Sequence, residues 1–105
     1  MDKKDVLKII SDFRKALETK IHVDSIILYG SYATGANREE SDIDIVVISD
    51  GFKGKTHWQR AGMLADAIYQ VLKPIEAVAM TNEEWEKGES VIAEFAKNGE
   101  IIRAA

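Results

Sequence analysis

The chain has 105 residues, 46% of them hydrophobic and 30% charged, and this size and composition predict a single soluble domain with one modest core. It contains no cysteine, which excludes both a disulfide scaffold and a thiolate zinc site. Its formal net charge of −4 disfavours a broad nucleic-acid-binding surface, because binding to phosphates requires an excess of lysine and arginine.

The first half of the chain predicts one helix followed by two strands. Apolar residues spaced three and four apart predict an amphipathic helix over residues 3–20. The apolar, β-branched run 23–28 predicts a buried strand, and the segment 30–41, rich in Gly, Ser, Thr and Asn, predicts a loop with room for one helical turn. Ile43, Ile45 and Val47 alternate with Asp42, Asp44 and Val46, which predicts a second strand with one face polar at its start.

A second apolar stripe follows this strand. It predicts a helix from about residue 56 to 72, with the stripe packed in the core. Lys73-Pro74 ends the predicted helix, because proline cannot continue a helix and restrains the residue before it. The stripe consists of Trp58, Ala61, Ala65, Ile68 and Leu72.

The last third of the chain predicts a strand and a helix. Residues 75–80 are mostly apolar and predict a third strand. Thr81 and Glu84 have the spacing of a capping box, which predicts a helix beginning near residue 82. Apolar spacing extends this helix toward Gly99, a typical C-terminal stop.

The order of these elements predicts the fold class. A short last strand at Ile101-Ile102 completes the pattern. Together the elements predict an α/β (α+β) fold, a small mixed sheet with helices packed against it, in one domain spanning residues 1–105. No secretory signal and no membrane-spanning apolar run is visible, so we expect a cytoplasmic protein.

Asp42 and Asp44 are the first candidate site residues. Two residues apart on a predicted strand, they point to the same face, whereas Ile43 and Ile45 point into the core. Adjacent carboxylates repel one another unless a cation lies between them, and Mg²⁺ prefers oxygen ligands. A lone Asp-x-Asp is more often a solvated strand end, so the assignment depends on further residues.

Glu76 supplies a third carboxylate. It opens the third predicted strand, where a charge is out of pattern with the apolar residues around it. If that strand pairs with the second one, Glu76 lies beside the two aspartates, and the three carboxylates together bind one or two metal ions. The alternative is an edge-strand glutamate in water.

Gly30 and Ser31 form the candidate anion-binding side. Gly30 follows a buried strand, where the missing Cβ permits a tight turn and a close approach of the backbone to a ligand. Ser31 offers a hydroxyl and a backbone N–H, and the start of a helix attracts phosphate. An ordinary glycine turn is the less favoured alternative, because this turn and the aspartates lie at opposite ends of one loop.

These motifs together resemble a known family. The run Gly30-Ser31-Tyr32-Ala33-Thr34-Gly35, followed by Ser41-Asp42-Ile43-Asp44-Ile45-Val46-Val47, resembles the signature of the polymerase-beta-like nucleotidyltransferases. The short chain and the motif spacing are similar to the minimal nucleotidyltransferase (MNT) branch of that superfamily. The specific match covers residues 29–48, and the order of elements agrees over nearly the whole chain.

The resemblance implies a role for each site residue. Gly30 and Ser31 would contact the triphosphate of ATP, and Asp42 and Asp44 would bind Mg²⁺. The third carboxylate of the family is usually an aspartate, and it falls at the position of Glu76. Glutamate is one methylene longer than aspartate. This departure from the family pattern is expected to alter the geometry of metal binding or the activation of the acceptor hydroxyl.

The resemblance also implies a partner. MNT proteins are often antitoxins of helical HEPN-domain toxins, and some transfer AMP from ATP to a tyrosine of that partner. The implied function is a magnesium-dependent protein adenylyltransferase that forms a complex with such a toxin. The alternative is a catalytically weak or inactive binding module that neutralises its partner by occlusion. Transfer to a small molecule or an RNA end is disfavoured, because relatives with those activities generally carry a further domain.

Overall fold

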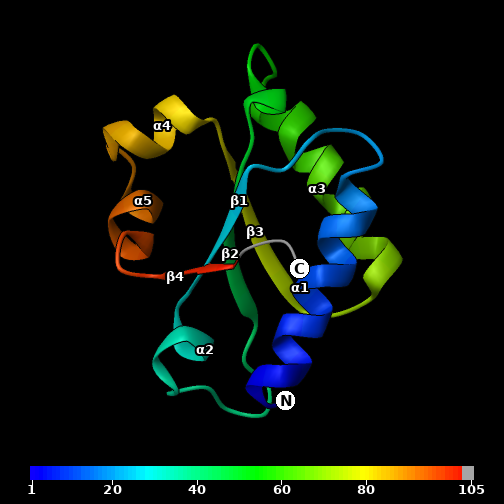
Figure 1. Ribbon diagram of the computed structural model, residues 1–105, viewed down its shortest axis with the longest axis vertical. Helices are drawn as coiled ribbons and strands as arrows, with labels where there is room; N and C mark the ends of the chain where they lie inside the picture. The colour runs from blue at the N-terminus through cyan, green and yellow to red at the C-terminus, as the bar shows by residue number, and fades with distance from the viewer. Residues whose placement is uncertain (103–105) are drawn as a thin grey trace.

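The structure is a computed structural model that describes residues 1–102, and it forms a four-stranded mixed sheet with helices on both faces (Figure 1). The strand order is β3-β2-β1-β4, with β1 antiparallel to β2 and β4, and β2 parallel to β3. The predicted α/β class is therefore confirmed. In chain order the elements are α1 (Lys3–Leu17), β1 (Ser25–Tyr29), α2 (Ser31–Thr34), β2 (Ile43–Ile48), the 3-10 helix η1 (Asp50–Phe52), α3 (His57–Val71), β3 (Ile75–Met80), α4 (Asn82–Lys87), α5 (Val91–Ala96) and β4 (Glu100–Ile102).

Helices α1 and α3 cover one face of the sheet. Alternate strand residues point toward them, and Ile26, Leu28, Ile43 and Ile45 are completely buried in this larger core cluster. The predicted apolar stripe of α1 packs into the same cluster, which confirms that prediction. Its buried members are Val6, Ile9, Ile10, Phe13 and Leu17.

The apolar stripe predicted for α3 is only partly in the core, so that prediction is wrong for most of its residues: Ile68 packs against the core cluster, but Trp58 and Leu72 lie on the outer side of the helix. Trp58 is 81% exposed and Leu72 is 73% exposed, and the other stripe residues are at most partly buried. Leu64 and Ala67 are the α3 residues buried against the sheet. The helix carries apolar side chains on two faces, so periodicity alone does not identify the inner one. The crossover from β2 to β3 determines which face meets the strands.

Helices α4 and α5 cover part of the opposite face (Figure 1). The predicted capping box is confirmed, since the Thr81 hydroxyl accepts from the Glu84 N–H (3.2 Å) and the Glu84 carboxylate accepts from the Thr81 N–H (2.7 Å). The predicted single helix is nevertheless interrupted. Gly88 adopts a left-handed conformation (φ 63°) that ends α4, and Ser90 caps a separate α5. This turn allows Ala93 to reach the sheet.

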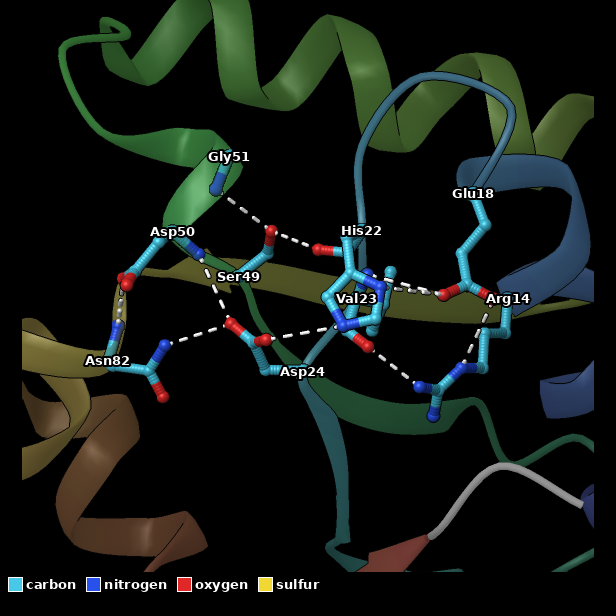
Figure 2. A network of polar contacts seen from close by, with 9 residues as sticks. All are labelled: Arg14, Glu18, His22, Val23, Asp24, Ser49, Asp50, Gly51 and Asn82. Carbon is cyan, nitrogen blue, oxygen red and sulfur yellow. Dashed lines mark hydrogen bonds and ion pairs between the residues drawn. The ribbon is translucent and has the colours of Figure 1, made fainter.

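A polar network holds one end of the sheet together, and Figure 2 shows it around Asp24. The Asp24 carboxylate accepts from the Asn82 side chain (2.9 Å) and from the Asp50 N–H (3.4 Å). The Ser49 hydroxyl donates to the His22 carbonyl. These contacts tie the segment before β1 to the end of β2 and the start of α4. They leave the other end of the sheet, where β1 ends and where β2 and β3 begin, free for a site.

No helix within residues 1–102 combines the length and the apolar character needed to cross a membrane.

Candidate active site

Asp44 and Glu76 lie side by side in the sheet. The parallel pairing of β2 with β3 places Asp44 opposite Glu76, so the strand pairing on which the Glu76 assignment depends is present. The antiparallel pairing of β1 with β2 places Tyr29 on the other side of Asp44. The three residues form a row across three strands, and by strand alternation this row faces away from α1 and α3.

Asp42 stands at the border of this row. It precedes β2 and its side chain is exposed, yet its charge acts on Asp44. Within residues 1–102, no three acidic or histidine side chains are grouped tightly enough to enclose a metal ion. The structure therefore brings Asp44 and Glu76 together and places Asp42 next to them rather than between them.

Gly30 lies directly against Asp44. Its φ of 73° is in the left-handed region that favours glycine. A Cβ added at this position would overlap the Asp44 Oδ2 atom and would lie 3.2 Å from the Asp44 Cγ atom. Backbone conformation and close approach both require glycine here, and the bend after β1 lies next to the acidic pair.

Ser31 begins the one-turn helix α2, which lies within the predicted loop 30–41, where one helical turn is allowed for. The N–H groups of Ala33 and Thr34 donate to the Gly30 carbonyl at 3.1 and 3.3 Å. The Ser31 N–H therefore belongs to the first turn of α2, where backbone N–H groups have no intrahelical acceptor. The half-buried Ser31 thus offers a backbone donor and a hydroxyl beside the bend.

Negative charge is crowded in this row. Burial, a hydrogen bond to Glu76 and the charges of Glu76 and Asp42 raise the pKa of Asp44 to about 6. Burial and the charges of Asp44 and Glu76 also raise the pKa of Tyr29. A hydrogen bond between two carboxyl groups requires a proton, and a cation can replace that proton by compensating both anions. The donors are all oxygen atoms on adjacent strands, which fits a hard divalent cation such as Mg²⁺.

Sequence reasoning does not identify Tyr29 as a member of the site. Tyr29 belongs to the site because it ends β1 and pairs with Asp44 of β2. The sequence alone does not show which residues of two strands pair with each other. Tyr32 occupies a different environment. It is buried in the core, and within residues 1–102 its hydroxyl has no hydrogen-bond partner. Tyr29 is therefore the tyrosine that belongs to the site.

The basic residues after β2 lie at the far end of the sheet. Lys53 pairs with Asp50 at 3.6 Å, and Arg60 pairs with Glu84 at 2.7 Å. Both pairs follow the ends of β2 and β3, whereas Asp44 and Glu76 lie near the starts of these strands. These two cations therefore do not compensate the charge of the acidic pair.

Sequence comparisons connect the chain to a family. The family model described as "Nucleotidyltransferase domain" matches residues 10–101. Two Methanocaldococcus jannaschii proteins named as putative protein adenylyltransferases are 48% identical over 46 residues and 49% identical over 45 residues. These alignments cover 44% and 41% of this chain, and 46% and 45% of the two relatives. The chain thus matches less than half the length of these relatives.

Two solved structures share the fold. A crystal structure described as a putative nucleotidyltransferase from Sulfolobus solfataricus superposes with a TM-score of 0.72 at 18% identity, covering 93% of this chain and 79% of that one. A structure described as a toxin-antitoxin with AMP-PNP superposes with a TM-score of 0.64 at 20% identity, covering 94% and 73%. The family match includes the Gly30 bend, both aspartates and Glu76. The chain therefore belongs to the nucleotidyltransferase domain family, as the resemblance of residues 29–48 predicts.

Proposed function

We propose that this domain transfers AMP from ATP to a hydroxyl group of a protein partner in a magnesium-dependent reaction. The observation that carries the proposal is the contact of Gly30 with Asp44 next to Glu76. This arrangement combines a backbone bend suited to phosphates with carboxylates suited to a divalent cation. The naming of the two relatives as protein adenylyltransferases supports AMP as the group transferred and protein as the acceptor.

In the proposed reaction, the acceptor oxygen forms a bond to the α-phosphorus of ATP while the bond to the pyrophosphate oxygen breaks. The backbone N–H groups at Gly30 and Ser31 hold the triphosphate so that attack is in line with the leaving group. Glu76 accepts the proton of the attacking hydroxyl. Asp44 and Glu76 would hold Mg²⁺, with Asp42 next to them as a further ligand once the ion binds, and the ion would supply positive charge to the phosphates.

The proposed acceptor is a helical toxin of the HEPN class, which makes this protein an antitoxin. The toxin-antitoxin description of the AMP-PNP-containing structure supports a role of this kind. The class of the toxin rests on the resemblance to MNT proteins. A cytoplasmic location is part of the same proposal, because the reaction consumes ATP and modifies an intracellular toxin.

Labelling with [α-³²P]ATP tests the proposal. The wild-type chain should label its co-expressed partner in the presence of Mg²⁺, and Asp44→Asn and Asp42→Asn should reduce labelling at least 100-fold, because each removes a metal ligand. Asp12→Asn is the matched control, since Asp12 pairs with Lys8 on the surface of α1. Equal labelling by Asp44→Asn and the wild-type chain would contradict the assignment of Asp44 as a metal ligand.

A second candidate function is neutralisation by occlusion without catalysis. The observation that favours it is Glu76, which stands where the family usually has an aspartate and shares a hydrogen bond with Asp44. In that case Asp44→Asn should still bind the partner and still restore growth of cells that express it. A pulldown combined with a growth-rescue assay separates the two functions. Retained binding with lost rescue excludes occlusion.

A further inference from the structure

The outer side of α3 carries large apolar side chains in contact with solvent. Trp58 is 81% exposed, Tyr69 is 76% exposed and Leu72 is 73% exposed. The helical repeat places all three on one stripe, together with the small residues Ala61 and Ala65. Large apolar patches of this kind on a small domain mark interaction surfaces. We call these five residues the α3 outer stripe.

The α3 outer stripe is symmetric about its centre. Ala65 is the middle residue, Trp58 and Leu72 lie seven residues on either side of it, and Ala61 and Tyr69 lie four residues on either side. If two α3 helices pack antiparallel with both Ala65 residues on a two-fold axis, Trp58 faces Leu72 of the other copy. In the same arrangement the large Tyr69 faces the small Ala61 of the other copy. The Tyr69–Ala61 pairs thus match a large side chain with a small one, and the Trp58–Leu72 pairs match an aromatic side chain with an aliphatic one.

We propose that two copies of this chain form a dimer through antiparallel pairing of their α3 outer stripes. A two-fold dimer uses the same patch on both copies, so a self-complementary stripe is the geometry that it requires. Ala65 at the axis, and Gly62 one helical turn before it, where an added Cβ would meet only open space, allow the two backbones to approach closely. Close approach of this kind gives the short interaxial distances of packed helices, about 8 Å.

The exposed area suits such a dimer. The exposed parts of Trp58, Tyr69 and Leu72 amount to about 500 Å² per copy, since a large aromatic side chain buries about 150–250 Å². Two copies together would bury about 1,000 Å² or more, which is near the lower end of specific protein interfaces. A weak, reversible dimer is therefore expected.

Charge at the border of the stripe also fits an apolar, uncharged occupant. Asp66, the charged residue of α3 that follows Ala65, is engaged by Lys20 at 2.6 Å. Another α3 outer stripe presents an apolar surface of this kind. The dimer leaves the acidic pair accessible, because α3 covers the face of the sheet opposite to Asp44. Figure 1 shows α3 at the margin of the molecule, beside α1.

Single-cysteine cross-linking tests the geometry, because the native chain has no cysteine. Ala65→Cys should form a covalent dimer under mild oxidation, since a two-fold axis brings the two thiols within disulfide range. Gln70→Cys is the matched control, because Gln70 is exposed on the same helix but outside the stripe. We expect at least a tenfold faster cross-linking of Ala65→Cys. Equal rates for the two variants overturn the proposal.

Sedimentation velocity tests the dimer without cross-linking. The wild-type chain should approach twice the chain mass as its concentration rises through the micromolar range. Ala65→Arg should stay monomeric with an unchanged circular dichroism spectrum, and Gln70→Arg should dimerise like the wild type. A wild-type chain that is monomeric at several hundred micromolar overturns the proposal. If Ala65→Arg then abolishes co-purification with a different protein, the stripe binds that protein instead.

Discussion

The contact between Gly30 and Asp44 predicts the effect of adding one methyl group at position 30. Gly30→Ala adds strain at positive φ and drives a Cβ into the Asp44 carboxylate, so under the proposed function nucleotide binding should fall at least tenfold. Gly35→Ala is the matched control, because Gly35 also has positive φ (82°) but an added Cβ there would meet only open space. Gly35→Ala should lose about 1 kcal/mol of stability from backbone strain, and Gly30→Ala should lose more, because its Cβ also overlaps the Asp44 carboxylate. Calorimetric titration with an ATP analogue should separate them.

The raised pKa of Asp44 makes a prediction for stability as a function of pH. The pKa of this carboxyl is about 6 in the folded chain and about 3.9 in an unfolded one, so the folded state binds the proton more tightly. The stabilisation from this protonation is complete below about pH 4 and is lost as the pH rises through about 6. Asp44→Asn should therefore be more stable than the wild type at pH 7.5, by about 1 kcal/mol after solvent screening.

Urea denaturation at pH 7.5 and at pH 4 measures this effect. The gain in unfolding free energy of Asp44→Asn over the wild type should shrink toward zero at pH 4. If Asp44→Asn were less stable than the wild type at pH 7.5, the claim that the charge of Asp44 destabilises the folded chain would be wrong. Under the proposed function, a gain in stability on replacing Asp44 is expected, because the site requires an unfavourable concentration of negative charge.

At the same scale, sequence alone finds most of the candidate site. Asp44, Glu76 and Gly30 stand out because each breaks the local pattern, two as charges among apolar strand residues and one as a glycine after a strand. Tyr29 does not stand out, because an aromatic residue at a strand end is ordinary and only its pairing with Asp44 gives it significance. The border position of Asp42 also depends on where the strand begins, which sequence patterns locate poorly.

At the scale of elements, the start of α4 offers a test of its capping box. Burial opposes ionisation of Glu84, but the hydrogen bond from the Thr81 N–H and the contact with Arg60 outweigh it, and the pKa of Glu84 is lowered. The stabilisation is present above the unfolded pKa of about 4.3 and is lost as the pH falls through the lower folded value. Glu84→Gln should cost about 0.5–1 kcal/mol at pH 7 and little at pH 3.

Chemical denaturation at the two pH values measures the loss. Glu83→Gln serves as the control on the same helix, because within residues 1–102 Glu83 pairs with Lys87 alone, on the surface. An equal loss of unfolding free energy for both glutamate variants at pH 7 would mean that the hydrogen bonds of the capping box add no stability beyond that of a negative charge in the first turn of α4.

The sequence predicts the order and kind of these elements better than their orientation. Strand β3 is predicted with its observed bounds, because proline marks its start and the Thr81 cap marks its end. The buried face of α3 is predicted wrongly for Trp58 and Leu72 and correctly for Ile68, because large apolar side chains lie on both the outer and the inner side of this helix. The break between α4 and α5 is missed, because apolar spacing continues across it and only the left-handed turn at Gly88 reveals it.

At the scale of the whole molecule, ligand binding should be visible as thermal stability. Under the proposed function, Mg²⁺ with a non-hydrolysable ATP analogue at 100 times its dissociation constant adds about 2.7 kcal/mol to the unfolding free energy. The melting temperature should rise by several degrees and return to its starting value with a chelator. Asp44→Asn should show no rise, whereas Asp12→Asn should respond like the wild type. A rise that survives chelation would contradict metal-dependent binding.

The parallel pairing of β2 with β3 has a consequence for newly made chains. Asp44 and Glu76 are far apart in sequence and meet only after α3 has crossed the sheet, a non-local closure that forms slowly. A chain that has been synthesised only as far as β2 contains Asp44 but not Glu76. Under the proposed function we expect such a chain to be inactive. Under the proposed function, activity therefore arises only once β3 has paired with β2, and a chain that ends before β3 should not consume ATP.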